Sequence, residues 1–181
     1  MKEEEILKFE KKLFFYLNQV DEKNKEKLFS LWNENREIML KAPGSKIKHQ
    51  SWKGGYLVHL VDTMMYAESM ILDIENRFDI KISFSSAILV LFLHDLEKPW
   101  KYVLKHKFAN EKEKKEFINF LLEKYKIILN DDEKNALKYI HGEGGEYSPD
   151  VRVQKPLAAL CHAADNNSAR ISFDKIPKIN F

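Results

Sequence analysis

Apolar residues recur along the chain with the spacing of amphipathic helices. From Glu3 to Val20 they stand three or four positions apart, and the same pattern follows Asp21, a residue type that caps helices. Side chains with this spacing share one face of a helix. We therefore predict two N-terminal helices, ended by Ala42-Pro43-Gly44-Ser45 and followed by a loop that reaches Gly55.

The next two helices are predicted to be central. The segment Tyr56–Arg77 is apolar or neutral on almost every side, which is typical of a buried helix. The run Ala87–Leu93 is wholly apolar and follows the capping serines of residues 83–86. Its composition suits a buried strand as well as a helix. We interpret it as a helix because it continues through Lys98 and stops at Pro99.

Three further helices complete the prediction. One spans Asn110–Ile128, and the next begins with a capping box at Asn130 and Glu133 and ends at His141-Gly142. Pro156 suits the first turn of a last helix that reaches Arg170. The fold class expected from the whole pattern is all-α.

Composition narrows the class of protein. A chain of 181 residues favours one domain, and only 6 Gly and 5 Pro argue against a turn-rich β fold. The net charge of +2 gives no support for a protein that coats DNA or an anionic membrane. The single cysteine, Cys161, excludes an intrachain disulfide framework and fits a reducing compartment. The longest apolar run is too short for a membrane span, so we expect a soluble, cytoplasmic protein with no membrane partner.

The dipeptide His94-Asp95 is the strongest chemical signal. It follows seven apolar residues directly, so its carboxylate is expected to be buried and to need a compensating partner. A divalent cation is one such partner. The alternative is an ion pair of Asp95 with Lys98, three residues later, beside an ordinary core histidine.

Other candidate ligands stand in other predicted helices. His59 lies on the less apolar side of the third helix, Asp165 lies in the last helix, and His141 ends the helix before it. Helical bundles build metal sites in this way, with facing helices each projecting a ligand into the core.

The order of these residues resembles the HD superfamily of metal-dependent phosphohydrolases. The motifs that carry the resemblance are HQSWKGGYLVH at residues 49–59, LFLHDLEKP at 91–99 and HAADN at 162–166. The resemblance covers roughly residues 49–170. The loop at 141–149 and the Ala-Asp-Asn segment look most like the HD domains of certain bacterial 3′-to-5′ exoribonucleases.

The resemblance implies a fold, a domain division and a metal site. The fold is an HD-domain-like helical bundle with two extra N-terminal helices, divided into an extension at residues 1–41 and a metal-binding domain at 42–181. The metal ligands are His59, His94, Asp95 and Asp165. Nitrogen and oxygen ligands without thiolate suit Mn²⁺, Fe²⁺, Ni²⁺, Co²⁺ or Mg²⁺. Gly142 stands where relatives often have a further histidine, which favours one metal ion.

The resemblance also implies roles near the metal. Asp95 is expected to orient a water molecule, and Lys98 to stabilise charge on the phosphate or, equally, to be an ordinary lysine at a helix C-terminus. His141 is a candidate proton donor or outer metal ligand, with a plain helix cap as the alternative. His49, Lys53 and Lys98 are candidate substrate contacts.

The expected function is hydrolysis of a small phosphorylated substrate, a nucleotide or short oligonucleotide phosphoester. The alternative is a catalytically silent metal- and nucleotide-binding regulatory HD module. Glu97 is the hint for that alternative, because many relatives have glycine there. The sequence leaves the oligomeric state open.

Overall fold

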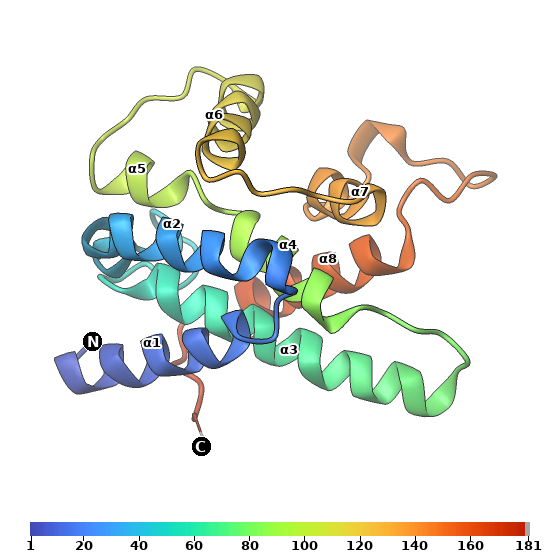
Figure 1. Ribbon diagram of the computed structural model, residues 1–181, viewed down its shortest axis with the longest axis horizontal. Helices are drawn as coiled ribbons and strands as arrows, with labels where there is room; N and C mark the ends of the chain where they lie inside the picture. The colour runs from blue at the N-terminus through green and yellow to red at the C-terminus, as the bar shows by residue number, and fades with distance from the viewer. Residues whose placement is uncertain (180–181) are drawn as a thin grey trace.

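The computed structural model describes residues 1–179, and every regular element in them is a helix (Figure 1). No strand occurs in this part of the chain. The elements in chain order are α1 (Glu3–Leu17), α2 (Glu22–Lys41), α3 (Gly55–Arg77), α4 (Phe84–Leu93), α5 (Lys98–Tyr102), α6 (Glu111–Lys124), α7 (Asp131–Tyr139), the 3₁₀ turn η1 (Gly144–Glu146) and α8 (Pro156–Arg170). The prediction of an all-α protein is confirmed.

Helix α3 is the centre of the packing. It contacts α1, α2, α4 and α8, and its first ten residues, Gly55 to Met64, are buried on every side of the helix. Helix α4 is equally enclosed, because every residue from Ser86 to Leu93 is buried. Figure 1 shows α1 and α3 along one side of the protein and α6 on the other, with α4 and α8 between them. The prediction that these two apolar segments are central is confirmed.

Helices α1 and α2 pack onto this centre. Asp21 caps α2 as predicted, because its carboxylate accepts a hydrogen bond of 3.0 Å from the Asn24 amide. Buried Glu10 of α1 joins the pair by accepting hydrogen bonds from Trp32 and Arg36 of α2. The division of the chain at residue 41 stays a prediction.

The helix that precedes His94 is shorter than predicted. We expected it to continue through Lys98 and stop at Pro99, but α4 ends at Leu93 and a turn follows. In that turn the Lys98 amide donates to the Asp95 carbonyl at 3.0 Å, three residues back. Proline lacks an amide and clashes with the carbonyl four residues earlier, so it fits the first turn of a new helix, where Pro99 lies. The reading of Lys98 as a helix-C-terminal lysine is therefore wrong, since it begins α5.

The two glycines before α3 have a packing reason. Gly54 has φ of +83°, a left-handed conformation that other residues rarely adopt. A side chain on Gly55 would overlap the backbone of Gln50, which crosses this point closely. The pair therefore lets the loop of residues 42–54 fold back against the start of α3.

Helix α7 begins where its caps predict. Asn130 accepts from the Glu133 amide at 2.9 Å, and the Glu133 side chain accepts from the Asn130 amide at 2.8 Å, so the capping box is confirmed. The Glu133 side chain also accepts from the Ser86 hydroxyl at 2.7 Å, which ties α7 to α4. The helix ends at Tyr139, two residues before the predicted end. The helix predicted at Asn110–Ile128 is also shorter, because α6 ends at Lys124.

Among residues 1–179, no helix is both long enough and apolar enough to cross a membrane.

The capping box at the start of α7 is expected to contribute to the free energy of unfolding. Replacing Asn130 by alanine removes an acceptor from the first turn of α7 and is expected to lower the free energy of unfolding by about 1 kcal/mol. Asn130→Gly should cost only a few tenths of a kcal/mol, because glycine is itself tolerated at this position. Urea denaturation followed by circular dichroism measures both. Equal stability of the two variants would show that the cap is not what holds the start of α7.

Candidate metal centre

Four side chains meet in the interior, and they are the four expected from the sequence. His59 comes from α3, His94 and Asp95 from the turn after α4, and Asp165 from α8. One nitrogen or oxygen atom of each lies within 4.8 Å of the others, so the group could hold a metal ion. The prediction that Asp165 joins the His94-Asp95 pair is confirmed.

The distances suit ligands that surround one cation. His94 Nε2 lies 3.0 Å from Asp95 Oδ2, and His59 Nε2 lies 3.1 Å from Asp165 Oδ1. The two Nε2 atoms are 3.3 Å apart. Neighbouring ligands of an octahedral ion about 2.1 Å away are themselves about 3 Å apart. The residues present therefore fit a divalent cation with nitrogen and oxygen ligands.

The outer nitrogen of each imidazole is held by another group. His94 Nδ1 lies 2.7 Å from the Leu91 carbonyl oxygen, which can only accept, so Nδ1 carries a proton. His59 Nδ1 lies 3.0 Å from the Ser168 hydroxyl. Such contacts fix the rings so that each Nε2 faces the cluster, as in known metal sites. Two histidines buried in an ordinary core would not need to turn their Nε2 atoms toward the same point, so this geometry supports a metal site.

Ser168 is a functional candidate that the sequence prediction missed. It is fully buried and stands three residues after Asp165, on the same face of α8. That spacing was the available signal, but serine is common in helices and carries no distinctive mark. Its hydroxyl also lies 3.4 Å from the side-chain amide of buried Gln50.

Charge within the cluster is strongly coupled. Burial disfavours the His94 cation, but Asp95 and Asp165 outweigh this effect and raise the pKa of His94 to about 10. Burial would raise the pKa of Asp95, yet Lys98 and His94 hold it well below its usual range. The pKa of Asp165 is likewise lowered, against burial, by hydrogen bonds from His141 and His59. Both carboxylates are therefore anionic at neutral pH.

Lys98 pairs directly with Asp95, as the simpler interpretation of the motif expected. That pair does not remove the need for a cation, since Asp165 contributes a second buried carboxylate. The lysine ammonium is largely enclosed, with its side chain 11% exposed. It therefore lies at the inner edge of the cluster, where it could contact a bound anion.

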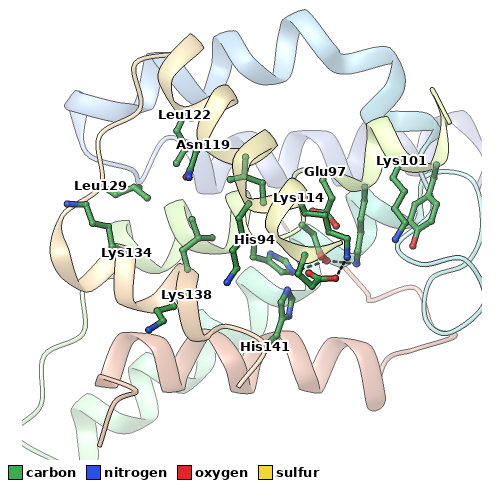
Figure 2. A pocket seen from close by; sticks show the side chains of 17 residues that line it. His94, Glu97, Lys101, Lys114, Asn119, Leu122, Leu129, Lys134, Lys138 and His141 are labelled. Atoms are coloured by element: carbon green, nitrogen blue, oxygen red, sulfur yellow. Dashed lines mark hydrogen bonds and ion pairs between the residues drawn. The ribbon is translucent and has the colours of Figure 1, made fainter. Parts of the chain in front are cut away.

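A cleft of about 650 Å³ opens beside the cluster (Figure 2). Its size suits a small organic ligand. His94 and Asp95 form part of its wall, and α5, α6 and α7 supply most of the rest. Six lysines line it: Lys98, Lys101, Lys114, Lys115, Lys134 and Lys138. The cluster is thus open to a ligand from one side.

The remaining candidates lie in different places. His141 lines the cleft with its side chain 62% exposed, and its Nδ1 is 3.4 Å from Asp165 Oδ2. His49 stacks on His59 at a ring distance of 4.8 Å, outside the cleft. Lys53 is exposed in the loop before α3 and does not line the cleft. His162 Nδ1 lies 2.6 Å from the Ile140 carbonyl, a contact that supports the loop after α7.

Comparison with known proteins adds no relative. Neither family models, curated proteins nor solved structures give a match to this chain. The interpretation of the site therefore stands on its residues and their geometry.

Removing the Ser168 hydroxyl is expected to weaken metal binding. In the Ser168→Ala variant the His59 ring loses the contact that orients it, and affinity for Mn²⁺ should fall by about 10- to 100-fold. Isothermal titration calorimetry on protein purified without a nickel column measures this. Asn166→Ala, an exposed change on the same helix, is the matched control and should bind as the unmodified protein does. Unchanged affinity in Ser168→Ala would contradict the proposed role.

Metal binding is expected to release a proton and to strengthen with pH. Below its pKa of about 10, His94 carries an extra proton that a cation must displace, whereas both carboxylates are already ionised. Affinity for Mn²⁺ should rise by up to about tenfold per pH unit between pH 6 and 8. Calorimetry in buffers of different ionisation enthalpy measures the proton count. A flat affinity over this range with no proton release would refute the assignment.

Proposed function

We propose that the protein is a divalent-metal-dependent phosphohydrolase of the HD type. The observation that carries the proposal is the convergence of His59, His94, Asp95 and Asp165 beside an open, lysine-lined cleft. Their order along the chain is the one that the resemblance implies. An HD-domain-like bundle, extended by α1 and α2, is part of the same proposal.

The residues around the cluster suit hydrolysis of a phosphoester. When bound, a divalent cation would polarise the phosphoryl group and lower the pKa of an attacking water molecule. Asp95, deprotonated and buried, orients that water. Lys98 and Lys101 face the same cleft and stabilise negative charge that develops on the phosphate.

His141 is the residue that we propose protonates the leaving group. It is the exposed histidine at the cleft, and its contact with Asp165 orients the ring toward the cluster. We assign it the delivery of a proton to the departing oxygen, with an outer position in the metal site as the alternative. His49 and Lys53 remain predicted substrate contacts at the outer loop.

A nucleotide or a short oligonucleotide is the substrate class that the resemblance implies. Lysine ammonium groups match phosphate charge, and six of them line the cleft. The cleft volume of about 650 Å³ is within the range of pockets that take small organic ligands. Both features support a phosphorylated small molecule in general.

A catalytically silent regulatory module is the second candidate, and Glu97 favours it. This side chain is buried at the cleft, and burial together with the charge of Asp95 raises the pKa of its carboxyl group. A carboxyl group at this position narrows the room beside Asp95 and, when ionised, repels a phosphate. Such a site could bind a metal and a ligand without turnover.

An activity assay separates the two candidates. Protein loaded in turn with Mn²⁺, Fe²⁺, Ni²⁺, Co²⁺ or Mg²⁺ is incubated with nucleoside monophosphates, short oligonucleotides and a generic phosphodiester. We expect hydrolysis with at least one metal, its loss in His94→Ala and Asp95→Ala, and a fall of about 10²-fold in kcat for Lys98→Ala. His106→Ala changes an exposed histidine remote from the cluster and should retain full activity.

The folded state of each variant is checked by circular dichroism. Inactivity of the unmodified protein with every metal and substrate, combined with tight metal binding, would favour the regulatory module. Absence of any bound metal and of any metal-dependent rise in Tm would reject both candidates.

A further inference from the structure

The two ends of the cleft differ in chemistry. At one end Lys101 and Tyr102 lie near Lys98 and the metal-ligand cluster. The other end is formed by four aliphatic side chains, which we call the aliphatic end: Ile118, Leu122, Leu129 and Leu137. Figure 2 shows Leu122 and Leu129 on the opposite side of His94 and His141 from Lys101. The cluster therefore lies between an end with Lys98 and Lys101, which we call the basic end, and the aliphatic end, whose border carries Asn119, Lys134 and Lys138.

Helices α6 and α7, together with Leu129 in the loop between them, form the aliphatic end. On α6, Ile118 and Leu122 are four residues apart, on the side that also carries Lys114. On α7, Leu137 is flanked by Lys134 and Lys138. The stretch from Ile118 to Leu122 extends about 6 Å along the helix axis. These apolar side chains continue the wall of the cleft beyond Lys114.

These aliphatic side chains are incompletely covered by the protein. All four are only partly buried, although each packs against the core on one side. Their other side faces the cleft of about 650 Å³. Apolar surface left open inside a cavity is a common property of sites that take an apolar ligand group.

A nucleobase is a poor match for this end. Proteins bind unpaired bases by stacking them on aromatic side chains or arginine. Among the described residues that line the cleft, the aromatic rings are those of Tyr102 at the basic end and of His94 and His141 at the cluster, and none lies among the four aliphatic side chains. A chain of methylene groups needs no such partner and gains from contact with leucine and isoleucine.

The basic end supplies the complementary site for a phosphate. Lys98 already contacts Asp95, and no ion pair in residues 1–179 involves Lys101. Both ammonium groups lie on the cleft beside the cluster. A ligand with an anionic head and an apolar tail would thus meet a matching surface at each end.

We propose that the preferred substrate is a phosphoester of an aliphatic alcohol, with its phosphate at the cluster and its chain along the aliphatic end. This inference rests on the proposed phosphohydrolase function and replaces the nucleoside by an alkyl group. In the reaction, the oxygen of water forms a bond to phosphorus and the bond from phosphorus to the alkoxy oxygen breaks. The alcohol leaves with one proton, and inorganic phosphate remains.

Binding of alkylphosphonates tests the inference without requiring turnover. Ethyl-, hexyl- and octylphosphonate carry a carbon–phosphorus bond that a phosphohydrolase does not cleave by this route. Titration calorimetry of the Mn²⁺-loaded protein should show affinity rising with chain length, by up to about fourfold per buried methylene. Hexylphosphonate should bind at least about tenfold more tightly than ethylphosphonate, and octylphosphonate more tightly than AMP or the dinucleotide pApA.

Two substitutions test whether the aliphatic end causes the dependence of affinity on chain length. Leu122→Asn and, independently, Leu137→Asn should reduce the ratio of octyl to ethyl affinity by about tenfold or more. Phe120→Asn changes an exposed residue of α6 outside the cleft and should leave that ratio unchanged. Circular dichroism verifies that each variant is folded.

The outcomes distinguish this inference from the proposed function. Equal affinity for all three phosphonates, or tighter binding of AMP or pApA, would overturn the aliphatic substrate. Hydrolysis of nucleotides with no chain-length preference among alkyl phosphates would overturn it while the phosphohydrolase stands. Chain-length-dependent binding of phosphonates, with no hydrolysis of alkyl phosphates or any other ester, would instead overturn the phosphohydrolase and leave an aliphatic-anion binding site.

Discussion

The burial of two carboxylates among apolar helices is the constraint on which the structure depends. Asp95 is 5% exposed at the end of a helix that is itself enclosed, and Asp165 faces it from α8. Removing such charges from water costs several kcal/mol each unless partners compensate. Lys98 and the imidazoles of His59 and His94 compensate in part. A divalent cation would complete the compensation and would do so at the one point that all four ligand atoms share.

The arrangement of helices follows from bringing these groups together. Helices α3 and α8 pack closely, and the buried residues of α8 include the small Ala158, Cys161 and Ala164. Small side chains let the two backbones lie near each other, which places Asp165 and Ser168 against His59. Helix α7 then covers the open side, held by its contacts with α4 and α8. The same helix contacts therefore form the core and bring the candidate metal ligands together.

Much of this could be predicted because it is encoded locally. Helix starts at Asp21, Asn130 and Pro156 depend on hydrogen bonds or backbone restrictions within one turn, so short sequence patterns identify them. Charged and imidazole groups stand out in apolar segments, which made the four ligands and His141 candidates, and the resemblance to the HD superfamily then selected the four. The end of α4 could not be predicted, since Pro99 permits either the last turn of one helix or the first turn of the next, and only packing decides.

The role of Ser168 and the cleft could not be predicted from the sequence, for a different reason. Ser168 becomes relevant only through a contact with a residue 109 positions away. The aliphatic residues of α6 have the same spacing as an ordinary core face, and their exposure to a cavity depends on where α6 is held. Periodicity distinguishes buried from exposed faces but does not distinguish a filled interior from an open cleft.

The contacts that keep α6 away from α7 therefore determine whether the cleft exists. Lys124 and Tyr125 at its C-terminal end contact Glu34 of α2, and Phe117 packs against Trp100 of α5 at a ring distance of 5.3 Å. Both anchors lie on the side of α2 and α5, not on the side of α7. Collapse of the aliphatic residues onto each other would bury more apolar surface, but it would require these polar and aromatic contacts to break. The contacts of α6 with α2 and α5 hold this wall of the cleft in position, so the space beside the cluster stays open.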